Sequence, residues 1–308
     1  MLTKGKEVWK LYSVREWVKN WSAPQLDLAL SPRDRTVERM MAERMGVEFP
    51  QIGYTRYRSI LADVVAHEFA RRVGALDIGF EARLTNSGMA AVEAVVEAAE
   101  IQPGDNIARG EVLYSMTPQV LERRRGLTGG RLTLDVLPAD AGNFFDAAKK
   151  DYQRYSRRMF FFETIGNGRP MPVFEFDGVL RDVWRWENTW LVLDNTFLTC
   201  VLFNPFAVYA RVREEFGEDP RVKFVYVESL SKHYRAHGGF DHAPGGIVIG
   251  PKDFIAKCDE ALQFGGVMTT PTLLDFTYDL YDAAAAVMPQ LSRNAAAAAE
   301  FLRGHSQT

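Results

Sequence analysis

Short apolar segments alternate with longer segments of helical periodicity along most of the chain, beginning near residue 81. Strand-like alternation or a short apolar run occurs near residue 107 and at residues 131–137, 159–162, 190–194, 221–227 and 246–250. Helical spacing of apolar residues occurs at residues 89–100, 117–125 and 179–187. Because short strands separated by helices favour parallel pairing, we expect an α/β fold with a mostly parallel sheet flanked by helices.

The two ends of the chain lack this alternation. Residues 1–50 mix tryptophan, arginine, glutamate and proline without a sustained period, and we interpret them as an N-terminal arm. Residues 51–265 are expected to form one large domain. Residues 266–308 include alanine runs at 283–286 and 295–299, and alanine is the best helix former, so we expect a helical C-terminal region.

Charge and composition exclude several classes of protein. The 37 Lys+Arg and 40 Asp+Glu residues give a net charge of −3, without the basic excess of a nucleic-acid-binding protein. Two cysteines, Cys200 and Cys258, cannot build a disulfide framework and favour a reducing compartment. The N-terminus has no uninterrupted apolar core, and the most apolar stretch, residues 190–209, is too polar to cross a bilayer. We therefore expect a cytoplasmic protein with neither nucleic-acid nor membrane partners.

Polar residues follow the predicted strands, where ligands of parallel α/β sheets bind. Asp194 ends the segment 190–194, and Lys232 follows the segment 221–227. Asp194 and Lys232 are separated in the sequence by about the length of one β–α–β crossover. An acid and an amine from adjacent strands could therefore face the same crevice, although an arbitrary lysine is usually a surface residue.

A candidate anion site precedes the first predicted helix. The hydroxyl of Ser87 and the free backbone N–H groups after it suit a phosphate, although a simple helix cap has the same sequence pattern. A lysine, a carboxylate and a phosphate site in one crevice meet the requirements of pyridoxal 5′-phosphate. The lysine forms a Schiff base with the aldehyde, and the carboxylate pairs with the pyridinium nitrogen. We therefore expect this cofactor.

Several segments, in the right order along the chain, resemble the Cys/Met-metabolism family of fold-type I pyridoxal-phosphate enzymes. This family includes cystathionine γ-synthase, cystathionine lyases and methionine γ-lyase. The segments are GYTRY at residues 53–57, SGMA at 87–90, PGD at 103–105 with LY at 113–114, ETIGN at 163–167, DNTF at 194–197 and SLSK at 229–232. The resemblance implies an aspartate aminotransferase-like fold and β- or γ-elimination or replacement on an amino acid, a small-molecule substrate.

The same resemblance implies a role for particular residues. Lys232 would be the Schiff-base lysine and proton carrier, Asp194 the pyridinium partner, and Tyr114 the residue that stacks on the ring. The further cofactor contacts would be Ser87, Gly88, Met89, Asn167, Thr196, Ser229 and Ser231. Tyr54 and Arg56 would hold the phosphate of a neighbouring subunit, which implies a homodimer or homotetramer with shared active sites.

The sequence also departs from the family pattern. Ile165 and Gly168 replace the prolines around Asn167, so we expect a different loop path there. Arg58-Ser59-Ile60 replaces Gly-Asn-Pro, and the segment after Lys232 is shifted and altered. Family members continue into a C-terminal domain whose arginine binds the substrate carboxylate. We expect most of that domain to be absent, or a separate partner to replace it, or the substrate to be recognised differently.

Other interpretations follow from the same residues. Another pyridoxal-phosphate reaction, such as aminotransfer or racemisation, would use the same residues around the cofactor. A non-catalytic role, binding only the cofactor or a partner subunit, is also open. An NAD enzyme is disfavoured because no Gly-x-Gly-x-x-Gly follows an early strand. A metal site at His233, His237 and His242 is disfavoured because Gly238-Gly239 indicates a loop. We interpret both cysteines and residues 160–162 as buried core.

Overall fold

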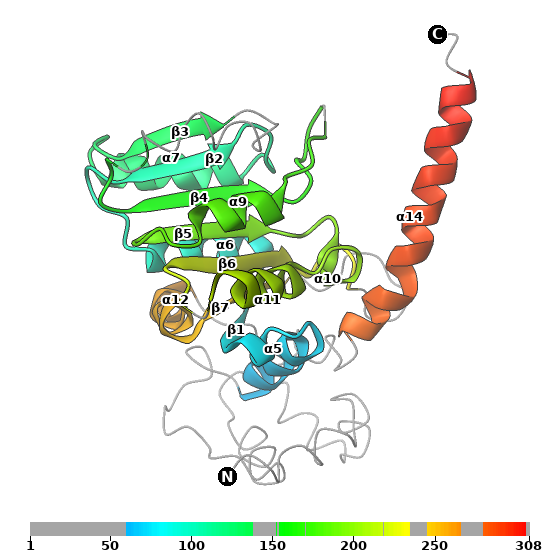
Figure 1. Ribbon diagram of the computed structural model, residues 1–308, viewed down its shortest axis with the longest axis horizontal. Helices are drawn as coiled ribbons and strands as arrows, with labels where there is room; N and C mark the ends of the chain where they lie inside the picture. Colours follow the sequence, from blue (N-terminus) through cyan, green and yellow to red (C-terminus); the bar gives the residue numbers. More distant parts are fainter. Residues whose placement is uncertain are drawn as a thin grey trace.

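The computed structural model describes residues 60–137, 152, 154–169, 171–217, 219–234, 245–265 and 280–305 (Figure 1). Within these ranges, one sheet contains the strands β1 (Phe80–Thr85), β2 (Asn106–Gly110), β3 (Thr133–Leu137), β4 (Arg158–Glu163), β5 (Thr189–Asp194), β6 (Val222–Ser229) and β7 (Gly246–Pro251). The helices are α5 (Ile60–Arg72), α6 (Gly88–Ala98), α7 (Thr117–Leu127), α9 (Phe176–Val183), α10 (Thr199–Leu202), α11 (Pro205–Phe216), α12 (Lys252–Gly265) and α14 (Leu280–His305), with a 3-10 helix, η1, at Leu76–Ile78. The predicted arm at residues 1–50 lies outside the described residues.

The strands are arranged in the order β1-β7-β6-β5-β4-β2-β3. Pairing is parallel from β6 through β5, β4 and β2 to β3. Strand β7 runs antiparallel to both of its neighbours, β1 and β6. The expected mostly parallel sheet is therefore confirmed, and the carboxyl ends of β1, β2, β4, β5 and β6 lie at the same edge.

Helices cover both faces of this sheet (Figure 1). On one face, apolar side chains of α6, α7 and α12 pack with Phe161 and Val192 of the central strands. On the other face, α5, α9, α11 and the first turns of α14 pack with Phe160 and Leu191. Successive residues of a strand point to opposite faces, so Phe160 and Phe161 belong to different clusters. Burial on both faces explains the continuous apolar runs of β4 and β5, and it confirms residues 160–162 as core.

The boundaries of some elements differ from those predicted. The prediction of a helix at residues 179–187 is wrong in its limits, because the Glu175 side chain caps the helix by accepting the N–H of Gly178 at 2.7 Å. The pattern did not predict α11, although Asn204 caps it in the same way and Pro205 opens it. Strand β6 extends to Ser229, two residues past its expected end.

Helix α14 confirms the helix expected around the alanine runs. Its first turns are held by burial of Ala284 and Met288, and from Gln290 onward almost every residue is exposed. Figure 1 shows this second half projecting away from the sheet. None of the helices in the described ranges combines the length and apolarity needed to span a membrane.

A buried polar cluster connects β6 to α10. The hydroxyl of Tyr226 donates to the carboxyl group of Glu228, and the thiol of Cys200 donates to the Tyr226 oxygen at 3.3 Å. Glu228 is 1% exposed, and this burial raises its pKa to about 8 against the opposing effect of the Tyr226 hydrogen bond. Cys200 and Cys258 are both buried free thiols, as predicted.

Replacing Glu228 with glutamine should flatten the pH dependence of stability. The folded chain keeps this proton to about pH 8, whereas the unfolded chain loses it near pH 4.5, so stability falls as pH rises between these values and levels off above pH 8. The group contributes a slope of about 1.4 kcal/mol per pH unit. Urea unfolding between pH 5 and pH 8 should show that the free energy of unfolding depends less steeply on pH in Glu228→Gln. Glutamine retains an acceptor for the Tyr226 hydroxyl. The exposed Glu214→Gln is the matched control, and equal slopes in wild type and Glu228→Gln would contradict the assignment.

Candidate active site

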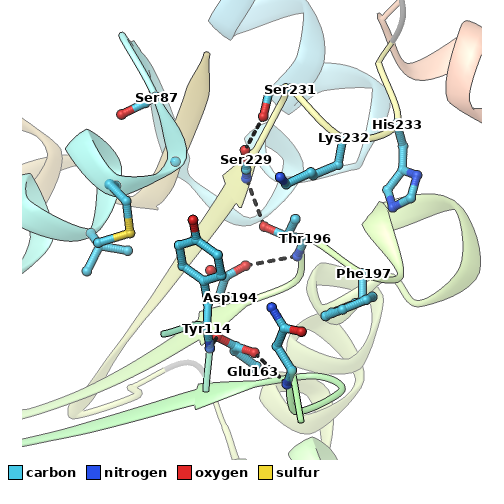
Figure 2. A pocket seen from close by; sticks show the side chains of 14 residues that line it. Ser87, Tyr114, Glu163, Asp194, Thr196, Phe197, Ser229, Ser231, Lys232 and His233 are labelled. Atoms are coloured by element: carbon cyan, nitrogen blue, oxygen red, sulfur yellow. Dashed lines mark hydrogen bonds between the residues drawn. The ribbon is translucent and has the colours of Figure 1, made fainter. Parts of the chain in front are cut away.

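A cavity of about 440 Å³ opens at the edge of the sheet where the parallel strands end (Figure 2). This volume is within the range of small-molecule sites. Its lining includes ten of the twelve predicted cofactor-binding residues: Ser87, Gly88, Met89, Tyr114, Asn167, Asp194, Thr196, Ser229, Ser231 and Lys232. The other two, Tyr54 and Arg56, lie outside the described residues.

One wall of the cavity is the N-terminus of α6. Ser87 is the N-cap, and its side chain accepts the N–H of Ala90 at 3.1 Å. The next residue, Gly88, lies against Ser229 at the end of β6. A Cβ at position 88 would be 2.7 Å from the Cβ of Ser229, which is closer than real Cβ contacts. Glycine at position 88 therefore lets the start of the helix meet the end of the strand.

Hydrogen bonds connect the ends of β5 and β6 across the cavity floor. The Ser229 hydroxyl lies 2.9 Å from that of Ser231, and the Ser229 N–H donates to the Thr196 hydroxyl at 2.9 Å. The Thr196 N–H donates in turn to a carboxylate oxygen of Asp194 at 2.9 Å. Two serine hydroxyls beside a helix N-terminus are suited to a phosphate.

Asp194 is the last residue of β5, and its carboxyl group faces this cavity. Burial raises its pKa, and the hydrogen bonds from Thr196 act in the opposite direction. A cation in the cavity would favour the ionised form of Asp194 by direct charge pairing. The site thus offers a half-buried carboxyl group with which a protonated ring nitrogen could pair.

Lys232 enters from the turn after β6, and Tyr114 enters from the loop after β2. Figure 2 shows the Lys232 amine and the Tyr114 ring directed into the same space, near Asp194 and Thr196. Lys232 is exposed, and the Tyr114 side chain is 40% exposed. The crevice expected between Asp194 and Lys232 is present because β5 and β6 are parallel neighbours.

Four lining residues were absent from the predicted set: Val92, Glu163, Phe197 and His233. Glu163 ends β4, so the rule that polar residues at strand ends form the site could have found it. Figure 2 shows His233 and Phe197 on the side of the cavity beside Lys232. Within the described ranges no group of three His, Cys, Asp or Glu residues could hold a metal ion, and His237 and His242 lie outside those ranges.

The residues present fit pyridoxal 5′-phosphate. The start of α6, with Ser87 as its N-cap, and the paired hydroxyls of Ser229 and Ser231 suit its phosphate. Asp194 suits its ring nitrogen, and Lys232 supplies an accessible amine for its aldehyde. The cavity has room for the ring between Tyr114 and the ends of the strands.

Comparison with known proteins gives the family of the chain. The profile of the family described as Cys/Met metabolism PLP-dependent enzyme matches residues 36–215, more than half of the chain. The chain belongs to this family. This match confirms the predicted Cys/Met-metabolism family, the fold type and the cofactor. The domain limits at residues 50 and 265 stay predictions, as does the role of each site residue. A comparison with curated sequences found no match.

Solved structures share the fold of this member of the Cys/Met-metabolism family. Cystathionine gamma synthase from Xanthomonas oryzae pv. oryzae, in complex with cystathionine, has a TM-score of 0.63 and 21% identity over 84% of this chain. The metB protein from Corynebacterium glutamicum has a TM-score of 0.64 and 18% identity over 92% of this chain. This chain spans 59% of the Xanthomonas structure and 70% of the Corynebacterium structure. At these identities the likeness establishes the fold.

A third similar structure carries a covalently modified lysine. It is a Campylobacter jejuni subsp. jejuni protein assigned as an O-acetylhomoserine (thiol)-lyase (metY), solved with N′-pyridoxyl-lysine-5′-monophosphate. Its TM-score is 0.63 at 18% identity, and the match covers 92% of this chain and 76% of that one.

Replacing Gly88 with alanine should lower the stability of the cofactor-free protein. The added methyl group would overlap Ser229, so α6 must shift away from β6, and overpacking of this kind costs about 1–3 kcal/mol. Gly126→Ala in α7 is the matched control, because a Cβ there meets open space and alanine favours the helix. Urea unfolding would measure both variants. A Gly88→Ala chain as stable as wild type would show that the helix and strand are not in such close contact.

Proposed function

We propose that this chain binds pyridoxal 5′-phosphate in the cavity and catalyses β- or γ-elimination or replacement on an amino acid. The observation that carries the proposal is that Lys232 and Asp194, from the turn after β6 and the end of β5, line one cavity. The names of the similar structures, which include a cystathionine gamma synthase and an O-acetylhomoserine (thiol)-lyase, support a sulfur-containing substrate or product.

The phosphate would bind at the N-terminus of α6. Ser87, Gly88 and Met89 present hydroxyl and backbone N–H groups there, and the first N–H groups of a helix have no partner within the helix. The dipole of this 11-residue helix favours a negative charge at the same end. Ser229 and Ser231 would complete the contacts from the opposite side.

The ring would lie between Tyr114 and the end of β5. Asp194 would pair with the ring nitrogen and keep it protonated, with Thr196 holding one carboxylate oxygen in place. Tyr114 would stack on the ring, and Asn167 would contact its oxygen. When bound, the cofactor supplies an electron sink for the bond broken at the substrate carbon.

Lys232 is the proposed proton carrier. Its amine would remove the proton from the substrate Cα and return one as the general acid. Exposure of its side chain leaves the amine room to move between cofactor and substrate. The Tyr114 phenol would transfer a proton at the leaving group.

Borohydride treatment should attach the cofactor irreversibly to the peptide that contains Lys232. Lys232→Ala should lose this attachment, and its turnover should fall roughly 10²–10⁴-fold, the usual contribution of a general acid–base. Lys252→Ala, at an exposed lysine that pairs with Glu81, is the matched control.

Product analysis with a panel of amino acids would test the reaction class. Release of ammonia, keto acid and thiol, or formation of a substituted amino acid, is expected. Attachment at another lysine would contradict the proposed site, while aminotransfer, racemisation or absence of turnover would contradict the proposed reaction.

We also propose a homo-oligomer in which Tyr54 and Arg56 of one chain hold the phosphate bound by another. The support is the GYTRY segment, since an arginine fork suits phosphate. Arg56→Ala and Lys232→Ala chains, inactive alone, should regain part of the activity when mixed, because some sites then combine one intact segment with one intact lysine. An active monomer in sedimentation, or mixtures no better than the parent variants, would refute sharing.

A further inference from the structure

Glu163 is a buried carboxyl group in the cavity that the proposed reaction does not use. It is the last residue of β4, and it is 7% exposed. In the parallel pairing of β4 with β5 its partner is Asp194, so two carboxyl groups lie side by side at the ends of adjacent strands. Burial and the neighbouring Asp194 raise the pKa of Glu163 to about 8.

Such an arrangement is costly, because a buried acid beside another acid is destabilised by both desolvation and repulsion. An amide of the same shape would avoid both costs. Packing alone therefore does not explain a carboxyl group at position 163, and its contacts give a better reason.

Each oxygen of Glu163 accepts a backbone N–H from a different loop. Oε1 accepts from Tyr114 at 2.5 Å, in the loop after β2, and Oε2 accepts from Asn167 at 3.2 Å, in the loop after β4. Within the described ranges neither amide has another acceptor. A carboxyl group offers an acceptor on each of its two oxygens, so it can serve both N–H groups at once. Figure 2 shows Glu163 beneath the Tyr114 ring.

The two loops carry Tyr114 and Asn167, whose side chains line the cavity. Tyr114 is 40% exposed, so packing around its ring restrains it only in part. The position of the ring then depends on where its backbone is fixed. Glu163 fixes that backbone to the end of β4, next to Asp194.

We propose that Glu163 is a positioning residue that joins the Tyr114 and Asn167 loops, and so sets the aromatic ring and the amide around the bound cofactor. The inference rests on the proposed function for the identity of the ligand. The link between the two loops belongs to the chain alone and can be measured without ligand.

Glu163→Gln is the variant that separates positioning from folding. Glutamine keeps one acceptor oxygen but presents an NH₂ group where the second N–H needs an acceptor. It also removes the repulsion with Asp194, so the fold should be retained. Glu175→Gln is the matched control, since Glu175 also accepts a backbone N–H, from Gly178 at 2.7 Å, but does so outside the cavity.

Hydrogen exchange of the cofactor-free protein is the first measurement. The amides of Tyr114 or Asn167 should exchange roughly 10-fold faster in Glu163→Gln, as expected when one hydrogen bond is lost. Glu175→Gln should leave both amides at the wild-type rate. Unchanged exchange at both amides in Glu163→Gln would overturn the proposal whether or not the chain binds cofactor.

A cofactor titration is the second measurement. The affinity of Glu163→Gln for pyridoxal 5′-phosphate should fall roughly 10-fold, and the visible circular dichroism of the bound cofactor should change. In a Tyr114→Ala background the same substitution should cost less, because a residue that acts through Tyr114 gives non-additive effects. Equal losses in both backgrounds would overturn positioning through Tyr114. Failure of the wild-type chain to bind the cofactor would instead refute the proposed function.

Discussion

Parallel pairing of β4, β5 and β6 determines where the polar groups that end or follow these three strands lie. Glu163 pairs with Asp194, and Asp194 pairs with Val227, so the three strands end within a few residues of one another. Beyond that line the chain leaves the sheet, and backbone groups, hydroxyls and the Lys232 turn gather at one edge. The helix start at Gly88 completes the edge because it packs directly on Ser229.

Two carboxyl groups share this edge of the sheet. Glu163 and Asp194 lie side by side, and burial raises the pKa of both. In the proposed function a protonated ring nitrogen would offset this repulsion and draw Asp194 into its ionised form. Asp194 would then bind a cation, while the neighbouring Glu163 holds two loops. Because the two carboxyl groups repel each other, the affinity for the ligand and the order of the loops would be coupled.

The sequence predicted much of this arrangement, and the failures have local causes. Strand positions followed from apolar runs because both sheet faces are buried, and Asp194 and Lys232 followed from the strand-end rule. The start of α9 depends on the cap by the Glu175 side chain, which apolar periodicity does not predict. Glu163 directly follows the apolar segment 159–162, so the strand-end rule could have included it in the site. Its hydrogen bond to the backbone of Tyr114, 49 residues away, could not be predicted from any pattern of side chains.

The place of β7 has a consequence for the order of assembly during synthesis. Strand β1 lies near the start of the described residues, at Phe80–Thr85. Its neighbour in the sheet is β7, which ends at Pro251. Until β7 has been made, β1 has no strand with which to pair, and the turn at Ser87 cannot be fixed beside Ser229. Such a pairing between distant segments is slow to form. The phosphate end of the cavity should thus be completed last, and the nascent chain should gain affinity for its ligand only after residue 251 has left the ribosome.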